Sequence, residues 1–599
     1  MRAGDLASDT TALLGVEHSL GGRCWRARPA DDRTAIALSQ ALEVPDVVGR
    51  VLAARGVGVE EGESFLNPRL RDLLPDPGHL RDMDQAAARL VSAIADGQGV
   101  AVFGDYDVDG ATSTALLQRY FRAVGHDLTV YIPDRQREGY GPNAAALRAL
   151  RARGIDLVIT VDCGITAFEA LQAARDDGLE VIVVDHHQAE PRLPASIAVI
   201  NPNRLDDDSP HGQLAAVGVT FLLLVALNRA LRQAGWFENR AEPALMDWLD
   251  LVALGTVCDV VPLVGVNRVL VTQGLKVLAQ RRNAGLNALA DVAGVNVKPT
   301  AYHLGFALGP RINAGGRVGQ ADLGARLLAT EDADEARALA AELDRLNRER
   351  QAIEALALEE AVEQAEEQQA ARAPLLFVAS QRWHEGVIGI VASRLKDRYR
   401  RPALVLAQTD GQAKGSGRSV PGIDLGAAVT AAKQAGLLVN GGGHAMAAGL
   451  TVAADRMAEL QQFLSARIGP QLAEQPAVPE LVFDGAIAVR AANRELFDTL
   501  EAAGPYGAGH PEPRFVLPGV SLLKVDVVGQ DHVSFLVAGE DGGRLRGIAF
   551  RAAGSDLGQA LLQHGGRRFH LAGHLRADDW QGRRGVQLHL EDAAPAGSA

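Results

Sequence analysis

Acidic and imidazole side chains follow short apolar runs at several places in the first half of the chain. Three aspartates at alternate positions come after VAVFG, one follows LVITV, and an Asp-His-His triplet follows VIVV, with a further aspartate in ALGTVCDVVPL. In chain order these residues are Asp105, Asp107, Asp109, Asp162, Asp185, His186, His187 and Asp259. The first group alone is also compatible with a solvated acidic turn. Three groups that follow strands, one of them with paired histidines, predict a metal site.

The donor set indicates which cations such a site takes. Carboxylate oxygens with one or two imidazoles favour Mn²⁺ or Mg²⁺, although ligand type alone leaves zinc open. Two ions about 4 Å apart can hold an attacking hydroxide and a phosphoryl oxygen together. Such a pair needs one bridging carboxylate, and Asp162 is the natural candidate. A bound cation also relieves the repulsion and the burial cost of crowded carboxylates.

The elements that must position these groups are strands and helices in alternation. Near-continuous Val/Ile runs alternate with helical stretches from residue 99 to about 260, which predicts a parallel sheet covered on both faces. The carboxyl ends of parallel strands meet at one edge, where open α/β sheets bind ligands. The expected strands are 99–104, 128–133, 155–162, 180–187 and 197–203.

The rest of the chain divides into segments of different character. Residues 331–372 contain no Gly or Pro and carry an apolar stripe, so a continuous helix there would be on the order of 60 Å long, with two bent helices as the alternative. A second α/β pattern follows, and short alternating strands after about 485 suggest an OB-fold barrel. We expect an irregular segment, a parallel-sheet α/β domain, a connecting helix, a smaller α/β domain and a β-barrel at 1–50, 51–330, 331–373, 374–474 and 475–599.

Composition limits the function classes. The 599 residues exceed one hydrophobic core, and a net charge of −14 argues against a sequence-blind coat for nucleic acid. Three cysteines without a CxxC pair disfavour a thiolate zinc site and suggest a reducing compartment. No signal peptide is evident and the apolar stretch 214–227 is too short to span a bilayer, so we expect a cytoplasmic protein without membrane contact.

Arginines in glycine-rich contexts are candidates for phosphate binding, because guanidinium forks suit phosphate geometry. A surface salt bridge is the default for any one of them, and His384 beside Trp383 is equally explained as a core histidine. Basic pairs 567–568 and 583–584 near Phe569 and Trp580 suit backbone contact and base stacking on a single strand or, alternatively, a solvated sheet face with two ordinary core aromatics. The predicted substrate contacts are Arg135, Arg311, Arg317, His384, Ser416, Arg418 and His444.

DYDVDG, VDCG, DHH and the later Asp259 resemble the four motifs of the DHH phosphoesterase superfamily. GGGHAMAAG resembles the signature of its accessory DHHA1 domain. Four further motifs narrow the resemblance to the branch of single-stranded-DNA-specific 5′→3′ exonucleases, and it covers the chain from about residue 45 to the end. These motifs are GPRINAGGR, RWHEGVIGIVASR, GSGRS and GPYGAGHPEPRF.

The resemblance implies a role for each site residue. Asp107 would bind one ion and Asp109 the other, Asp162 would bridge them, and His186 with Asp259 would complete the site of Asp109. Asp105 would be a ligand of the first ion or support one. His187 would contact the scissile phosphate or protonate the leaving group, and Asp185 would orient a neighbouring imidazole. The chain departs from the pattern at Phe103, where many relatives have a histidine ligand, and at His510, where asparagine is usual.

The resemblance also implies an activity and partners. The expected reaction is two-metal release of 5′ mononucleotides from single-stranded DNA in DNA repair and recombination, with Mn²⁺ or Mg²⁺ as cofactor. The expected partners are single-stranded DNA, a single-strand-binding protein and a helicase, and we expect a monomer. The alternatives are a DHH phosphodiesterase of short RNA or dinucleotides, and a catalytically weak replication or repair scaffold. The region after 475 argues against the first, and the nearly complete ligand set against the second.

Overall fold

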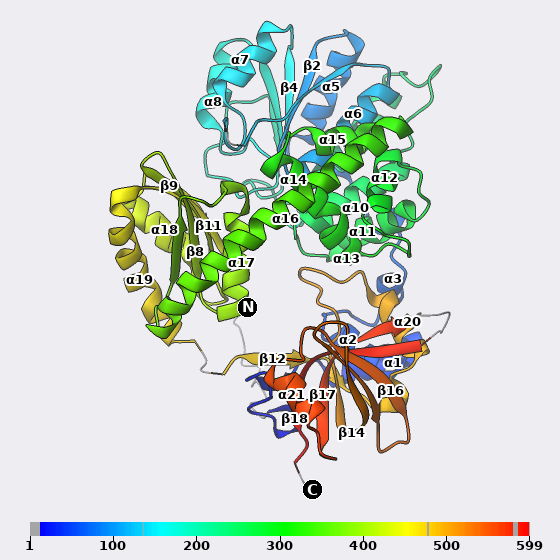
Figure 1. The fold of residues 1–599 in the computed structure, drawn as a ribbon. Coiled ribbons are helices and arrows are strands. Elements are labelled where there is room, and N and C mark those ends of the chain that lie inside the picture. The colour runs from blue at the N-terminus through cyan, green and yellow to red at the C-terminus, as the bar shows by residue number, and fades with distance from the viewer. Residues whose placement is uncertain (1–11, 136, 476–477, 579–584, 598–599) are drawn as a thin grey trace. The chain divides into compact units, whose positions relative to one another are not determined.

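The computed structural model describes residues 12–135, 137–475, 478–578 and 585–597. The chain forms two compact units, and each is described here by itself (Figure 1). The central unit comprises Asp76–Asp259 and Gly274–Gln475, and the terminal unit comprises Met1–Pro75, Val260–Gln273 and Pro476–Ala599. Residues 51–75 and 260–273 are thus grouped with the terminal unit, and the remainder of the predicted segment 51–330 lies in the central unit.

The first sheet of the central unit has five strands, all parallel, in the order β3-β2-β4-β5-β6. Its strands are almost wholly buried runs of Val, Ile and Ala, as a sheet covered on both faces requires. This confirms the expected parallel α/β fold. The strands are β2 (Val100–Gly104), β3 (Leu128–Tyr131), β4 (Leu157–Val161), β5 (Glu180–Val184) and β6 (Ala198–Ile200).

Helices cover both faces of this sheet. Two of them pack through Leu147, Leu150 and Leu171 against Val158 and Val181 on one face. On the other face one helix contacts β2 and β3, another contacts β6, and a third contacts β4 and β5 (Figure 1). In this order the helices are α7 (Ala144–Ala152), α8 (Phe168–Asp176), α6 (Val108–Ala123), α5 (Met83–Ala95) and α9 (Ala216–Gln233).

Of the described helices, α9 alone is long and apolar enough to cross a membrane by composition, and 72% of that stretch is buried inside the protein. It packs against α5, α6 and α10, so its apolar character is that of a core helix.

A helical layer completes this part of the central unit. A π-helix of five residues, η4 (Leu304–Leu308), lies directly between two α-helices. The segment 331–372 contains one continuous helix, α16, so the alternative of two bent helices is wrong. The helices are α10 (Leu249–Cys258), α11 (Gly265–Leu278, which begins in the terminal unit), α12 (Ala284–Val292), α13 (Ala301–His303), α14 (Gly309–Val318), α15 (Leu323–Ala329) and α16 (Ala333–Ala370).

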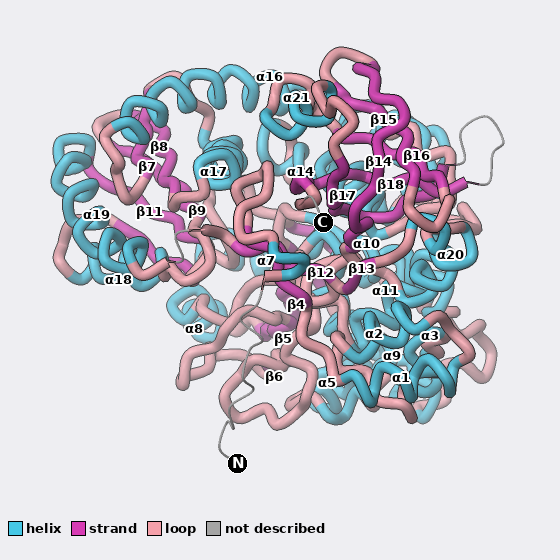
Figure 2. The backbone as a smooth tube through the Cα atoms, turned by 90° about the horizontal axis from the view of Figure 1, so that it is seen from below, coloured by secondary structure: helices cyan, strands magenta, loops and turns pink. Residues whose placement is uncertain are grey.

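The second sheet of the central unit has the order β10-β11-β9-β8-β7 and is mixed. Figure 2 shows four of its strands, β7, β8, β9 and β11, with α17, α18 and α19 around them. Alternate residues of β8 pack on opposite faces: Leu404 and Leu406 with α18 and α19, Val405 with α16 and α17. The elements are β7 (Leu376–Ser380), α17 (Glu385–Tyr399), β8 (Ala403–Thr409), β9 (Gln412–Arg418), α18 (Leu425–Gln434), β10 (Asn440–His444), β11 (Ala447–Ala453) and α19 (Met457–Ala473).

The terminal unit contains a closed five-stranded barrel, as expected for an OB-fold. The order β14-β15-β16-β18-β17 closes because β14 also pairs with β17. Strand β13 (Gly485–Ala486) adds to β14, and α20 (Arg494–Ala503) and α21 (Asp556–Leu562) accompany the barrel. The barrel strands are β14 (Phe515–Val528), β15 (His532–Ala538), β16 (Arg544–Ala549), β17 (Arg568–Asp578) and β18 (Gly585–Pro595).

Residues 24–27 and 32–42, within the segment for which the sequence predicts irregular structure, form a strand and a helix. Strand β1 (Cys24–Ala27) pairs in parallel with β12 (Glu480–Phe483), and Trp25 is fully buried beside Phe483. A strand of four residues shows too little alternation of polar and apolar residues to be predicted from the sequence. Its pairing could not be predicted either, because its partner strand lies more than 450 residues away. The first helices are α1 (Asp32–Leu42), α2 (Asp46–Ala53), α3 (Gly62–Leu66) and α4 (Leu70–Leu73).

Asp592 ties this segment to the last strand. Its buried carboxylate accepts hydrogen bonds from Ser19 Oγ at 2.6 Å, the Gly21 amide at 2.9 Å and Trp25 Nε1 at 3.1 Å. The insertion 260–273 joins the same unit, where Arg268 Nη2 donates to the carbonyl of Gly504 at 2.6 Å. Segments from both ends of the chain thus share one core.

We predict that Trp25→Ala destabilises the terminal unit by about 3–5 kcal/mol, because it leaves a large buried cavity and removes one donor from Asp592. Urea denaturation should show the loss, and hydrogen exchange should rise in β12 and β18. Ile36→Ala, at a side chain that is 55% exposed, is the control and should change stability by less than about 0.5 kcal/mol. Equal stability of the two variants would contradict the anchoring role of Trp25.

Candidate metal centre and phosphate-binding arginines

The predicted groups meet at the carboxyl edge of the parallel sheet. Gly104, Val161, Val184 and Ile200 lie in register across four adjacent strands. The residue after each is polar, so four side chains from distant parts of the sequence emerge side by side. They are Asp105, Asp162, Asp185 and Asn201.

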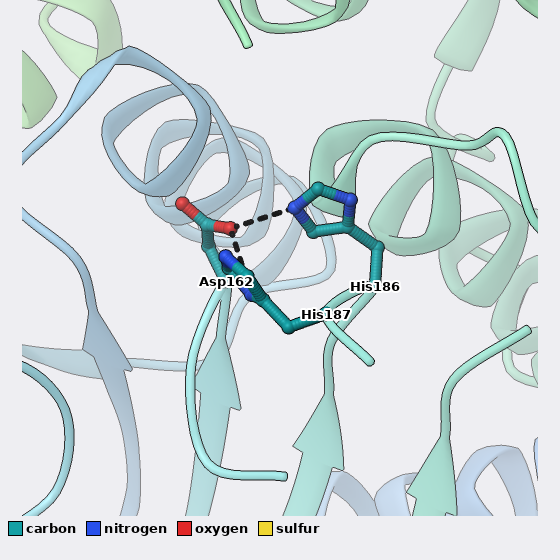
Figure 3. A group of neighbouring side chains, drawn as sticks. All are labelled: Asp162, His186 and His187. Carbon is teal, nitrogen blue, oxygen red and sulfur yellow. Dashed lines mark ion pairs between the residues drawn. The ribbon is translucent and has the colours of Figure 1, made fainter. Parts of the chain in front are cut away.

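Asp162 and the two histidines are close neighbours (Figure 3). His186 Nε2 lies 3.3 Å from Asp162 Oδ1, and His187 Nδ1 lies 4.0 Å from the same oxygen. His186 Nε2 is also 3.5 Å from Asp259 Oδ2 and 3.9 Å from Asp109 Oδ2. One imidazole therefore contacts three carboxylates from three different elements.

The ligand atoms form three overlapping groups, each within 4.8 Å. Buried atoms in these groups have no hydrogen-bond partner, namely one oxygen each of Asp105, Asp162 and Asp259, and Nε2 of His186. Buried polar atoms are normally satisfied, so this set of orphaned oxygen and nitrogen donors fits divalent cations. The groups are Asp162–His186–His187, Asp109–His186–Asp259 and Asp105–Asp107–Asp162.

The first motif turns directly from strand β2 into helix α6. Asp107 is the N-cap of α6, and its carboxylate accepts from the Gly110 amide at 3.0 Å. A Cβ at Gly110 would lie 2.5 Å from the carbonyl oxygen of Asp105, so this position requires glycine. The tight turn places three carboxylates on one side of the sheet edge.

Asp109 is fixed by the start of another helix. Its two oxygens accept from the backbone amides of Ala216 at 2.7 Å and Val217 at 2.8 Å, in the first turn of α9. Helix N-terminal amides stabilise a carboxylate through both hydrogen bonds and the helix dipole. Sequence reasoning missed this contact, because nothing near residue 216 marks it as part of the site.

Asp185 is satisfied by protein donors. It accepts from the amides of Ile165, His186 and His187, and from His187 Nδ1 at 2.8 Å. Burial opposes the charged form, but these bonds hold the pKa of Asp185 below its usual value. The bond through Nδ1 directs Nε2 of His187 away from Asp185, which agrees with the expected orienting role.

Three further residues hold the backbone of the site and were not predicted. Tyr140 OH donates to the carbonyl of Asp162 at 2.8 Å. Asn201 Nδ2 donates to the carbonyl of His187 at 2.9 Å, and Asn203 Nδ2 donates to that of His186 at 2.6 Å. The glycine-rich turn EGYGPN and the polar INPN after β6 were the available signals.

Burial and mutual repulsion dominate the electrostatics of the cluster. Burial and then neighbouring carboxylates raise the pKa of Asp109 and Asp162 well above the usual range, of Asp105 to about 8 and of Asp259 to about 7. Burial lowers the pKa of His186 to about 4, so this imidazole is neutral and able to act as a ligand. Without a cation, the carboxylates resist simultaneous ionisation.

Three of the predicted arginines gather beside this cluster. Arg135 stacks over the Tyr106 ring at 5.3 Å, and a Cβ on Gly316 would lie 2.9 Å from Tyr106. Burial and then the charge of Arg135 lower the pKa of both Arg317, to about 10, and Arg418. Among the residues that the structure describes, none of these three arginines is ion-paired with a carboxylate.

Glycines and main-chain carbonyls shape this arginine pocket, which we define as Arg135, Arg317, Ser416 and Arg418. Arg418 Nη1 donates to Ser416 Oγ at 3.2 Å, and Arg317 Nη1 donates to the carbonyl of Gly386 at 2.8 Å. A side chain at Gly389 would fill the space beside Ser416 and Arg418. The half-buried guanidinium groups of Arg317 and Arg418, with the exposed Arg135 beside them, suit an anion.

Other predicted contacts have different surroundings. Arg311 donates to Asp344 at 2.9 Å, so its charge is neutralised within the protein. His384 caps α17, where its Nδ1 accepts from the Gly386 amide at 3.0 Å. His444 is exposed on β10.

The structure decides between the two alternatives for one of the barrel aromatics. Phe569 is fully buried in the barrel core, so it is an ordinary core aromatic and is not available for base stacking. Arg568 is ion-paired with Glu540, and Arg567 lies over the Phe569 ring. Trp580, Arg583 and Arg584 lie outside the described residues. Phe103, in place of the expected histidine, is buried and stacks on Tyr131.

A parallel sheet with these acidic and DHH motifs at its strand ends defines the DHH phosphoesterase class. The family model described as DHH family, N-terminal domain, matches residues 99–256, the DHHA1 domain matches 372–469, and the RecJ OB domain matches 483–592.

Full-length relatives narrow the class. The chain is 38% identical to the single-stranded-DNA-specific exonuclease RecJ of Escherichia coli K12, over 92% of this chain and 96% of that protein. It is 39% identical to the RecJ of Dickeya dadantii, again over 92% and 96%. The crystal structure of Thermus thermophilus RecJ in complex with Mn²⁺ matches with a TM-score of 0.78 and 32% identity, over 95% of this chain and 79% of that one. The chain belongs to the RecJ family.

We predict that Asp162→Asn stabilises the protein when divalent cations are removed with EDTA at pH 8. A carboxyl whose folded pKa is raised costs stability above its unfolded pKa, and asparagine does not ionise, so a gain of about 1–3 kcal/mol is expected. Asp185→Asn is the matched control and should lose a similar amount, because the pKa of Asp185 is lowered and its bonds favour the charged form. Urea denaturation measures both, and destabilisation by Asp162→Asn would contradict the repulsion.

Proposed function

We propose that the chain is a metal-dependent 5′→3′ exonuclease that hydrolyses single-stranded DNA to 5′ mononucleotides in DNA repair and recombination. The observation that carries the proposal is the convergence of five buried or half-buried carboxylates and His186 at one sheet edge, beside an arginine pocket without counter-charges. The RecJ relatives support the reaction and its substrate.

The metal ligands would be the members of the three overlapping groups. Asp107 and Asp162, with Asp105, would hold one ion, and Asp109, Asp162, His186 and Asp259 the other, so that Asp162 bridges them. Mn²⁺ or Mg²⁺, the ions present in structures of Thermus thermophilus RecJ, supplies a nucleophile at neutral pH and stabilises charge on the phosphoryl oxygens. Phe103 removes one nitrogen ligand, so the first site would depend on oxygen donors.

His187 and Asp185 would provide the proton for the leaving group. Burial disfavours the imidazolium, but the hydrogen bond from His187 Nδ1 to Asp185 raises the pKa of His187 above its ordinary value. Nε2 would then carry the proton that the leaving 3′ oxygen takes up when water oxygen bonds to phosphorus and the P–O3′ bond breaks. Asp185 would thus act by orienting His187, as the resemblance implies.

The arginine pocket would bind the 5′-terminal phosphate. Arg317 and Arg418 come from two elements of the central unit and have lowered pKa values, which indicates that they are desolvated. A phosphate would relieve the repulsion among the guanidinium groups and accept from Ser416 Oγ. The other predicted contacts would support substrate binding less directly. His384 would do so as the cap of α17, His444 as part of the β10 hairpin, and Arg311 through its ion pair with Asp344.

One face of the barrel suits single-stranded DNA. Phe550 is 53% exposed, and its ring makes edge contacts with His532 at 5.3 Å and His589 at 5.1 Å. Arg546 is exposed on β16, four residues before Phe550. Strands two and three of OB-folds carry the nucleic-acid face, and aromatic rings beside cations suit base stacking and backbone contact.

The barrel distinguishes this reading from a phosphodiesterase of short RNA or dinucleotides, and the ligand set distinguishes it from a weak scaffold. The proposed enzyme is a monomer in the cytoplasm. A single-strand-binding protein and a helicase would deliver its substrate. The domain division that accompanies it assigns the catalytic site to the central unit and strand binding to the barrel.

We predict that Asp162→Ala lowers the rate of mononucleotide release at least about 1,000-fold, because it removes the shared ligand. The assay uses 5′-phosphorylated single strands with Mn²⁺, labelled at either end to establish polarity. Asp96→Ala, at an exposed carboxylate that ends α5, is the control and should keep full activity. Equal rates for the Asp162→Ala variant and the unaltered enzyme would refute the bridging role.

We predict that Arg317→Ala and Arg418→Ala each lower kcat/KM on 5′-phosphorylated strands by about 10–100-fold, because each removes a charge-assisted bond to phosphate. Both should reduce the preference for 5′-phosphate over 5′-hydroxyl ends. Arg394→Ala, whose side chain is 62% exposed and pairs with Glu354, should keep that preference. Variants that lose activity equally on both ends would argue against a terminal phosphate pocket.

A further inference from the structure

One loop and the helix start that follows it contact two of the proposed metal ligands. Residues 201–217 run from the end of β6 into the first turn of α9, within the central unit. In this 201–217 segment, Asn203 bonds to the backbone of His186, and the first amides of α9 bind the carboxylate of Asp109. Asp109 and His186 belong to the same group of ligand atoms, which Asp259 completes.

The side-chain amide of Asn203 joins two parts of the backbone. Its Nδ2 donates to the carbonyl of His186 at 2.6 Å and to the carbonyl of Gly212 at 3.0 Å. The backbone amide of Asn203 donates to Oδ1 of the fully buried Asn201 at 2.7 Å. One side chain therefore fixes the loop 201–212 against the peptide that carries His186.

The same segment holds the ring of His186. Burial lowers the pKa of this imidazole, and a hydrogen bond to the main chain of Leu214 acts in the opposite direction. Nε2 of His186 has no protein partner, so the bond to Leu214 uses Nδ1. An imidazole that binds a metal normally has its second ring nitrogen bonded in this way, which fixes its tautomer and its orientation.

Arg204 anchors the segment to the end of the sheet. Its side chain is buried, and Nη1 donates to the carbonyl of Val199 at 2.6 Å and to Asp82 Oδ2 at 2.7 Å. Nε donates to Asp206 Oδ1 at 2.7 Å. Because these charge-assisted bonds share one rigid planar group, they hold the loop in a single position beside β6.

Other segments support the ligands of the second proposed ion. Asp107 accepts from the Gly110 amide in its own turn at 3.0 Å. The carbonyl of Asp162 accepts from Tyr140 OH at 2.8 Å. The two proposed ions would therefore share Asp162 but have different supports.

We propose that the 201–217 segment positions the ligands of one ion, the ion held by Asp109, His186 and Asp259, and that Asn203 is a positioning residue of that site. The inference rests on the proposed function, which assigns two ions to the cluster. Asn203 would touch neither metal nor substrate, and it would act by fixing the peptide of His186. Removal of a group that supports a metal ligand typically weakens metal affinity 10–100-fold, and here the loss should fall on one ion only.

The test is a titration of the full-length chain with Mn²⁺, in which electron paramagnetic resonance measures the free ion. Asn203→Ala should weaken one of the two sites by about 10–100-fold and leave the other unchanged. In the Asp109→Asn background, where the same site is already damaged, Asn203→Ala should not weaken the remaining ion further. With excess Mn²⁺, kcat of Asn203→Ala should recover, and KM for a 5′-phosphorylated single strand should match that of the unaltered enzyme.

Asn287→Ala is the matched control, because Nδ2 of Asn287 also donates to a main-chain carbonyl, that of Arg281 between α11 and α12. This variant should bind both ions as the unaltered protein does. Asn203→Ser also loses the bridge between the two carbonyls, and it decides the question if the alanine variant does not fold.

An unchanged Mn²⁺ isotherm in Asn203→Ala, or equal weakening of both sites, would overturn the inference. If the unaltered protein binds two ions but releases no mononucleotides, the proposed function fails instead, and the isotherms still decide the role of Asn203. Binding of fewer than two ions by the unaltered protein would overturn both.

Discussion

The main physical constraint on the site is electrostatic repulsion among carboxylates that lie together at one buried sheet edge. Asp105, Asp109, Asp162 and Asp259 all have raised pKa values, because burial and their neighbours disfavour the charged forms. The fold tolerates this cost where a cation can offset it. The same crowding that destabilises the empty cluster is what makes it a strong site for divalent ions.

The surrounding protein compensates these carboxylates unequally. Asp185 is fully satisfied by backbone amides and His187, and Asp109 is held by the first amides of α9. Asp162 has an oxygen without a protein partner, and it contacts the imidazole of His186. This difference separates a side chain that orients others from a side chain that is left to bind a ligand, although both follow adjacent strands.

A second charge imbalance lies beside the first. In the arginine pocket, the guanidinium groups of Arg317 and Arg418 are desolvated, and neither is paired with a carboxylate among the described residues. Opposite excess charges in neighbouring sites suit a substrate that carries both phosphate oxygens for the cations and a terminal phosphate for the arginines. Helix α14 links the two, because it carries Arg317 at one end and, through η4, packs against the end of α10.

The sequence by itself determined the parallel sheet, the barrel and the set of metal-ligand candidates, whereas the structure decided that the helical segment 331–372 contains one continuous helix. Apolar strand runs are local patterns, and parallel strands bring their ends together by geometry alone. Only the tertiary structure decided that the amides of residues 216 and 217 hold Asp109, that Arg311 pairs with Asp344 and that Phe569 is buried. It also decided that the first strand completes the unit of the C-terminal barrel. These outcomes depend on contacts between distant segments, which leave no periodic or compositional trace near either partner.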